Sequence, residues 1–173
     1  VDTVRSVTNF APTLDFRYRF SRQHQLRIRY RGTTNQPSMS DLLDITDDSN
    51  PLDISKGNPG LKPSFTNNLN LFYNNFIQNH SRFINADLSM STTSNSISNM
   101  VTYDEATGGR TTRPENINGN WNLSGGFLFS TSIDSTGTWY TNTDTRASFA
   151  NSVGYLTLDR NTGVQKNRTQ SLN

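Results

Sequence analysis

Three short stretches of the chain alternate apolar and polar residues with a period of two, and arginine fills most polar positions of the first two. These stretches are residues 13–20, residues 25–31 and, more loosely, residues 120–129. A period of two is the pattern of a β-strand whose two faces meet different surroundings. We predict that one sheet face carries Leu14, Phe16, Tyr18, Phe20, Leu26, Ile28 and Tyr30. The opposite face should carry Asp15, Arg17, Arg19, Arg27, Arg29 and Arg31.

Two classes of protein show this alternation. A soluble sheet buries its apolar face in a core, whereas the wall of a membrane barrel turns its apolar face to lipid and its polar face to a wet interior. Only 31% of the 173 residues are hydrophobic, and a compact domain is usually nearer half apolar. A barrel wall needs apolar residues only at alternate positions, so the composition favours the barrel.

The connections between the predicted strands alternate in length. Tight turns are predicted at residues 21–24, 77–80 and 132–136, a further turn at 105–109, and a long loop at 32–63. Longer strands are predicted at residues 64–76, 81–104, 110–131 and 139–153. Alternating short and long connections are typical of outer-membrane barrels, so the long loop should lie at the opposite end of the sheet from the tight turns. We expect an all-β, antiparallel up-and-down meander of about six to eight strands, forming part of a transmembrane β-barrel.

Aromatic residues gather near the predicted tight turns. They are Tyr18, Phe20, Phe72, Tyr73, Phe76, Phe127, Phe129, Trp139 and Tyr140. Aromatic belts mark the boundary between membrane and water, although aromatic residues also favour strands in general. We expect an interfacial belt on the tight-turn side.

The long loop contains the one stretch with helical spacing, residues 38–43, which is long enough for a single turn. Met39, Leu42 and Leu43 lie close together there in an otherwise polar, acidic segment. Loops of this length are usually functional or disordered. We therefore take these three residues as candidate contacts to a ligand or partner, with the alternative that they pin the loop onto the barrel wall.

The sequence offers little for catalysis or metal binding. It contains no cysteine and two histidines, His24 and His80, both in predicted tight turns. Several aspartates crowd the long loop, but the spacing of a calcium-binding loop is absent, as are phosphate-binding and nucleophile motifs. We expect no enzymatic activity, no cofactor and no nucleic-acid partner, and we expect the arginines to face water or a plug inside a barrel.

Residues 57–73, which begin Gly-Asn-Pro-Gly-Leu-Lys-Pro-Ser, resemble TonB-dependent receptors, most closely the group often called outer membrane β-barrel family proteins. That family has Gly-Asn-Pro-x-Leu-Lys-Pro-Glu at the base of an external loop. The matching residues here are Asn58, Pro59, Leu61, Lys62 and Pro63, while Ser64 stands where the family has Glu. Residues 26–38 also fit the strand and Pro-Ser turn that precede the motif. Since proline removes a backbone donor, the next strand is expected to begin only after Pro63.

The resemblance implies a 22-stranded barrel filled by a plug, in the outer membrane of a Gram-negative bacterium and active in nutrient uptake. The chain has room for roughly a third of such a barrel and shows no plug-like segment. Residues 1–173 are therefore expected to form a single internal segment of the barrel. The implied partners are outer-membrane lipid, the receptor's own plug, an unidentified nutrient and a surface lipoprotein. The other hypothesis is a soluble or surface-exposed β-rich binding domain, such as an adhesin or carbohydrate-binding module.

Overall fold

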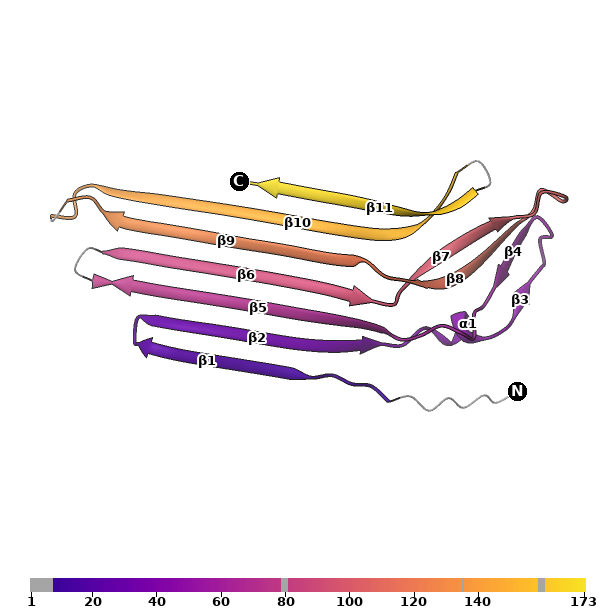
Figure 1. The fold of residues 1–173 in the computed structure, drawn as a ribbon, viewed down its shortest axis with the longest axis horizontal. Coiled ribbons are helices and arrows are strands. Elements are labelled where there is room, and N and C mark those ends of the chain that lie inside the picture. The colour runs from indigo at the N-terminus through magenta and orange to yellow at the C-terminus, as the bar shows by residue number, and fades with distance from the viewer. Residues whose placement is uncertain (1–7, 79–80, 135, 159–160) are drawn as a thin grey trace.

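The computed structural model describes residues 8–78, 81–134, 136–158 and 161–173. Most of these residues belong to one long antiparallel sheet of seven strands (Figure 1). In spatial order its strands are β1 (Thr13–Ser21), β2 (His24–Asn35), β5 (Ser64–Ile77), β6 (Arg82–Ser94), β9 (Asn120–Ser132), β10 (Tyr140–Leu158) and β11 (Asn161–Leu172). The order follows the chain, and every neighbouring pair is antiparallel. The predicted up-and-down meander is confirmed.

A second, smaller sheet lies at one end of the first. Its spatial order is β3 (Thr46–Asp47), β4 (Asp53–Lys56), β8 (Arg110–Ile117) and β7 (Ser96–Tyr103). A four-residue helix, α1 (Met39–Leu42), precedes β3. The pairing of β4 with β8 is parallel. It adds a strand of the long loop to the hairpin that β7 and β8 form much later in the chain.

The register of β1 and β2 confirms the predicted separation of faces. Leu14 lies opposite Tyr30, and Phe16 lies opposite Ile28, while Arg17 lies opposite Arg27 on the other side. The pairing shifts between Arg19 and Ser21. Phe20 nevertheless remains with the apolar face, since its ring contacts the Tyr18 and His24 rings at centroid distances of 4.5 and 4.1 Å.

The apolar face continues in register from β1 to β10, whereas β11 places Lys166, Arg168 and Gln170 on this side of the sheet. One row across the sheet contains Leu14, Tyr30, Leu69, Met90, Leu123 and Phe149. The next row contains Phe16, Ile28, Leu71, Leu88, Gly125 and Ala147. Many of these side chains are exposed, including Leu14, Phe16 and Leu88 at 56%, 48% and 41%. In the described part of the chain, no second layer covers this face (Figure 1).

The aromatic belt is only partly as predicted. Tyr18, Phe20 and Tyr73 lie on the apolar face, with Phe127 and Phe129 in register with them. The prediction was wrong for three other residues, because the strand period places them on the polar face: Phe72 opposite Arg27, Phe76 opposite Phe83, and Tyr140 opposite Ser132. Clustering near a strand end does not determine the face, whereas odd or even position does.

The predicted strands 81–104 and 110–131 are each broken in two, which corrects the expectation of two uninterrupted strands. Asn95, at φ +53°, separates β6 from β7, and Gly119, at φ +119°, separates β8 from β9. A left-handed residue ends a ladder because it turns the backbone out of the pleat. The β7–β8 hairpin can therefore leave the main sheet and build the second sheet.

The long loop lies at the opposite end of the sheet from the turns that join β1 to β2 and β9 to β10, as predicted (Figure 1). Its beginning differs from the prediction, because β2 continues to Asn35 and the connection therefore covers residues 36–63. The start of β5 at Ser64 confirms that pairing resumes only after Pro63. His80 lies outside the described residues.

Replacing Gly119 with alanine should destabilise the bend between the two sheets. A Cβ atom at this position would lie 2.9 Å from Cγ2 of Val153, and φ is positive. We expect a loss of about 1–3 kcal/mol in the free energy of unfolding, measured by urea titration of the full-length protein in detergent. Gly163→Ala is the control, since a Cβ atom there would meet nothing within 4 Å and φ is not positive. Equal midpoints for the two variants would contradict this account.

Candidate functional site

The long connection and the β7–β8 hairpin together form one structure, which we call the loop cap: residues 36–63 plus residues 96–117. Strand β4 joins the two parts. Arg110 donates two hydrogen bonds to Asp53, of 2.9 and 2.7 Å, and its backbone N–H donates to the Leu52 carbonyl at 3.0 Å. The guanidinium holds the pKa of the Asp53 carboxyl below its usual range, because it stabilises the charged form.

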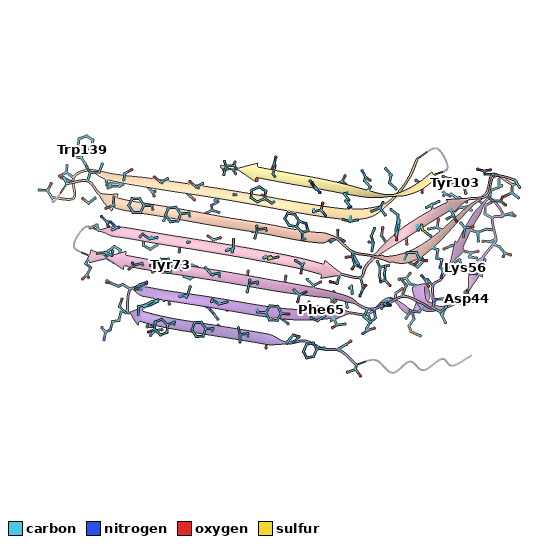
Figure 2. The ribbon with its side chains drawn as sticks, viewed as in Figure 1. Asp44, Lys56, Phe65, Tyr73, Tyr103 and Trp139 are labelled. Atoms are coloured by element: carbon cyan, nitrogen blue, oxygen red, sulfur yellow. The ribbon has the colours of Figure 1, made fainter. Side chains whose placement is uncertain are left out.

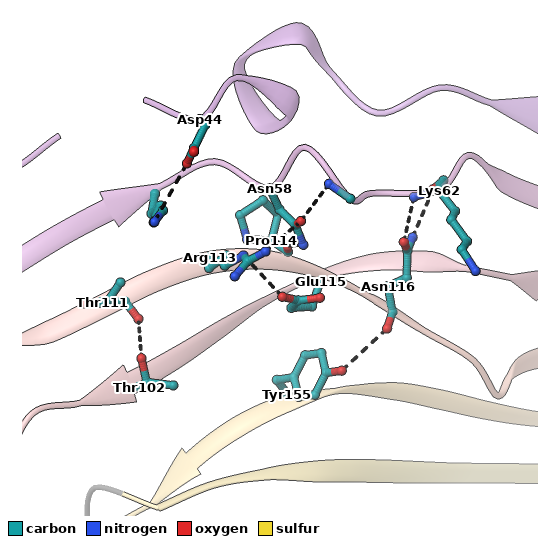
Figure 3. A network of polar contacts seen from close by, with 12 residues as sticks. Asp44, Asn58, Lys62, Thr102, Thr111, Arg113, Pro114, Glu115, Asn116 and Tyr155 are labelled. Atoms are coloured by element: carbon teal, nitrogen blue, oxygen red, sulfur yellow. Dashed lines mark hydrogen bonds and ion pairs between the residues drawn. The ribbon is translucent and has the colours of Figure 1, made fainter. Parts of the chain in front are cut away.

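Asn58 is the centre of a polar network between the loop and β8 (Figure 3). Its side chain is only 4% exposed. Nδ2 donates to the Pro114 carbonyl at 2.9 Å, while Oδ1 accepts from Arg113 at 2.8 Å and from the Gly60 N–H at 3.0 Å. The backbone N–H of Asn58 donates to the Asp41 carbonyl at 2.6 Å. Asn58 thus fixes the loop to the hairpin through its side chain and to α1 through its backbone.

Asn116 makes a second set of contacts beside the first (Figure 3). Its Oδ1 accepts from the Lys62 N–H at 2.8 Å, and its Nδ2 donates to the carbonyls of Lys62 and Asn95 at 3.0 and 2.9 Å. An amide side chain can satisfy a backbone donor and acceptor of one residue in this way, as a strand neighbour would. The backbone just before β5 is therefore held although Pro63 interrupts it.

Close packing supports the two amides. Leu61 is 2% exposed and is among the few buried hydrophobic side chains of the described residues, with Ile117 and Val153. At Gly57 a Cβ atom would lie 1.8 Å from the Leu43 carbonyl oxygen, so this position has no room for a side chain. The Leu61 N–H donates to the Asn58 carbonyl at 3.2 Å, which closes a turn over Pro59 and Gly60.

These contacts give the five motif residues distinct structural roles. Asn58 and Leu61 are buried where the loop contacts β8, and Pro59 forms the turn between them. Lys62 is held through its backbone, and Pro63 ends the loop before β5. Proline at the second position of a turn fixes φ at the value that the turn requires. Ser64, which stands where the resemblance places Glu, donates from its hydroxyl to the Asn35 carbonyl at 3.5 Å.

Helix α1 is the predicted single turn. Ser38 is its N-cap, with Oγ accepting from the Asp41 N–H at 3.1 Å. Met39 is exposed at 52%, whereas Leu42 and Leu43 are half-buried against the rest of the loop cap. The structure therefore separates the three candidate contact residues: Met39 faces outward, and Leu43 lines a cavity.

A cavity of about 430 Å³ lies between the long connection and the β7–β8 hairpin, in the region of Asp44 and Lys56 (Figure 2). Its lining combines Leu43 and Ile45 with polar and charged side chains from both parts of the loop cap. These are Ser40, Asp41, Asp47, Ser55, Lys56, Asn99 and Thr112. The cavity is large enough for a small organic ligand.

Three aspartates of the loop have partners other than a metal. Asp53 pairs with Arg110, and Asp44 lies 3.8 Å from the Lys56 ammonium. Asp47 accepts from the hydroxyl and the N–H of Ser49, and these bonds lower the pKa of its carboxyl. Among the residues that the structure describes, no three acidic or histidine side chains converge as a metal site would require.

The arginines predicted to share a face do so on β1 and β2. Asp15 accepts two hydrogen bonds from Arg27, at 3.1 and 2.5 Å, and lies 3.6 Å from Arg29. Arg17 lies directly opposite Arg27 in the ladder. The adjacent positions of β5 on this face are Asn68, Asn70, Phe72 and Asn74. This part of the sheet is strongly cationic.

Sequence patterns did not reveal the partners within the loop cap. Arg113, Pro114 and Asn116 form hydrogen bonds to motif residues that lie more than 50 positions earlier in the chain. Ile45 and Leu52, which the sequence patterns did not single out, are more exposed than Met39. The parallel pairing of β4 and β8 brings these segments together. No local pattern signals such a pairing.

A single antiparallel sheet with one continuous apolar face and one polar face is the architecture of a membrane-barrel wall. Residues 2–172 match the outer membrane protein beta-barrel family. The chain belongs to this family of outer-membrane barrel proteins. No curated protein and no solved structure matches the chain. Within the described residues, no helix is long and apolar enough to cross a bilayer.

Replacing Asn58 with alanine should loosen the loop cap while leaving the main sheet intact. The substitution removes the side-chain partner of the Pro114 carbonyl and of Arg113 Nη2, while Arg113 Nε stays 3.3 Å from Glu115. An unpaired buried polar group costs about 1–3 kcal/mol. We expect faster proteolysis of residues 36–63 in the full-length protein and an unchanged temperature of barrel unfolding. Asn142→Ala, at an exposed position of β10, is the control. Equal cleavage rates in both variants would show that Asn58 does not hold the loop.

Proposed function

We propose that this chain forms part of the wall and external loops of a TonB-dependent receptor that takes up a nutrient across the outer membrane of a Gram-negative bacterium. The observation that supports this most strongly is the single-layer sheet of a barrel family, whose loop cap rests on the motif that resembles these receptors. The protein's part in uptake would be passive, and we propose that it is not an enzyme.

In this proposal the apolar face contacts lipid, and the polar face with Asp15 and the arginines of β1 and β2 lines the lumen. The uncovered leucines and aromatic residues support this assignment, because a monomeric soluble protein rarely leaves so large an apolar face in water. The soluble binding-domain hypothesis requires a second layer over this face, and no described segment provides one.

The two edges of the sheet support a larger barrel. Six successive antiparallel pairings lead from β1 to β11, so these two edge strands run in the same direction. Direct closure would join them in parallel, whereas bacterial barrels have an even number of antiparallel strands. In this proposal an odd number of further strands of the same receptor completes the barrel, and lipid, the receptor's plug and a surface lipoprotein are its other partners.

The loop cap would face the outside of the cell and contact the nutrient. Its cavity combines apolar contacts from Leu43 and Ile45 with hydroxyl, amide and charged groups, so it suits a polar ligand better than an apolar one. Met39 and Leu52 are exposed on the same connection and would contact a larger partner.

The assignment of the two faces can be tested with one substitution at two neighbouring positions of β6. Leu88→Arg would place a charge in lipid at a cost of roughly 2–4 kcal/mol near the bilayer midplane, whereas Ser89→Arg would place it in the wet lumen. We expect much less folded Leu88→Arg receptor in the outer membrane and a near-normal amount of Ser89→Arg. Equal amounts would contradict the barrel wall.

Deletion of residues 38–48 tests the role in uptake. The deletion removes α1 and one side of the cavity but no strand of the main sheet. In cells carrying this receptor, we expect normal receptor levels and growth on a panel of limiting nutrients that is impaired as in a strain without the receptor. Unchanged growth at a normal receptor level would show that the loop cap does not contact the nutrient.

A further inference from the structure

The arginines of β1 and β2 form a line along the strands and not merely a cluster. Arg31, Arg29 and Arg27 occupy successive positions of β2 on one face, with Arg17 opposite Arg27 and Arg19 one step further along β1. Same-face positions are about 6.8 Å apart in a strand, so four consecutive rows carry arginine over about 20 Å. In a barrel these strands run from one side of the membrane to the other.

The charge on this line is poorly balanced. Asp15 is the one acidic residue in these rows of β1, β2 and β5, and it pairs with Arg27 and Arg29. The next carboxylate of these rows is Asp87 on β6, separated from Arg27 by Phe72. Within the described residues, no carboxylate lies within 4 Å of Arg17, Arg19 or Arg31. Like charges directly across a ladder, as at Arg17 and Arg27, destabilise a sheet. This arrangement therefore favours an occupant that carries negative charge.

The surroundings suit a passing solute. Next to the arginines, β5 offers the amides of Asn68, Asn70 and Asn74 and the ring of Phe72, and none of these groups neutralises the line. Guanidinium groups bind carboxylate and phosphate with two parallel hydrogen bonds. Evenly spaced guanidiniums let an anion exchange one partner for the next, as conduction requires favourable but replaceable sites.

We propose that this arginine line guides small anionic solutes, bearing carboxylate or phosphate groups, through the barrel lumen. The inference rests on the proposed barrel and specifies the chemical class of its cargo. The competing occupant of the same surface is an acidic polypeptide segment that fills the lumen and neutralises the arginines.

The test measures the local potential at a single thiol in the full-length receptor reconstituted in lipid vesicles. These 173 residues contain no cysteine, so Asn70→Cys places a thiol beside Arg29. Its rate of reaction is measured with an anionic and with a cationic methanethiosulfonate reagent. We expect the anionic reagent to react about tenfold faster, because fields of this kind raise local concentrations by that order, and we expect millimolar pyrophosphate to slow it.

Arg17→Gln combined with Arg31→Gln should lower this rate ratio severalfold and abolish the effect of pyrophosphate. These two arginines are chosen because the pairs that Asp15 makes with Arg27 and Arg29 remain intact. The matched control is Lys166→Gln with Arg168→Gln on β11, which removes the same charge from the opposite, apolar-facing side of the sheet. The control should leave the ratio unchanged.

Two outcomes would overturn the proposal. A ratio near one would show that this position does not favour anions, and a thiol that neither reagent reaches would show that the arginines are covered, as by an acidic segment. Leu71→Cys, one position along β5 and on the apolar face, reports separately on the barrel itself. If that thiol reacts with both hydrophilic reagents as fast as the thiol at position 70, the lipid-facing assignment fails. If it stays unreactive while the ratio at position 70 is near one, only the arginine line fails.

Discussion

The hydrogen-bonded ladder from β1 to β11 is the constraint on which the rest of the structure depends. In hydrocarbon an unpaired backbone group costs several kcal/mol, so each strand must pair along its length. The ladder also fixes which side chains share a row. A shift of one residue between β1 and β2 would place Arg17 among the leucines, so any register shifted by an odd number of residues would put charge on the apolar face. Backbone pairing and the alternation of apolar residues with arginine therefore select the same arrangement.

The loop cap is held together by a different kind of interaction. Buried hydrophobic side chains are few among the described residues, and they lie where the loop meets the hairpin and β10. Two asparagines, Asn58 and Asn116, supply the specific contacts instead, because each amide both donates and accepts. Such a joint requires little apolar material, which suits a chain with this composition. Its contacts depend on the direction of each donor and acceptor, so they hold one arrangement of the loop against the hairpin.

The main sheet and the loop cap have different roles in the proposed function. The sheet provides a wall with a lipid side and a cationic side, and the loop cap adds a cavity with mixed polar and apolar lining. At Asn95 and Gly119 the chain bends from the main sheet into the loop cap. These bends let the β7–β8 hairpin leave the main sheet and pair with β4 of the long connection. A parallel pairing anchored by Asp53 and Arg110 thus turns two surface loops into one folded unit.

The sequence by itself determined the two faces, the alternation of turns and the strands of the main sheet apart from the breaks in two of them, because a period of two is local and survives in any register that keeps the faces apart. It also determined the end of the loop, since Pro63 removes a ladder donor and β5 begins at the next residue. Only the tertiary structure decided what the motif does. Asn58 meets Arg113 and Pro114 through a pairing between segments more than 50 residues apart, and local patterns carry no information about such contacts. The breaks in the two long strands were also decided by the tertiary structure, through positive φ angles at Asn95 and Gly119 that propensity does not reveal.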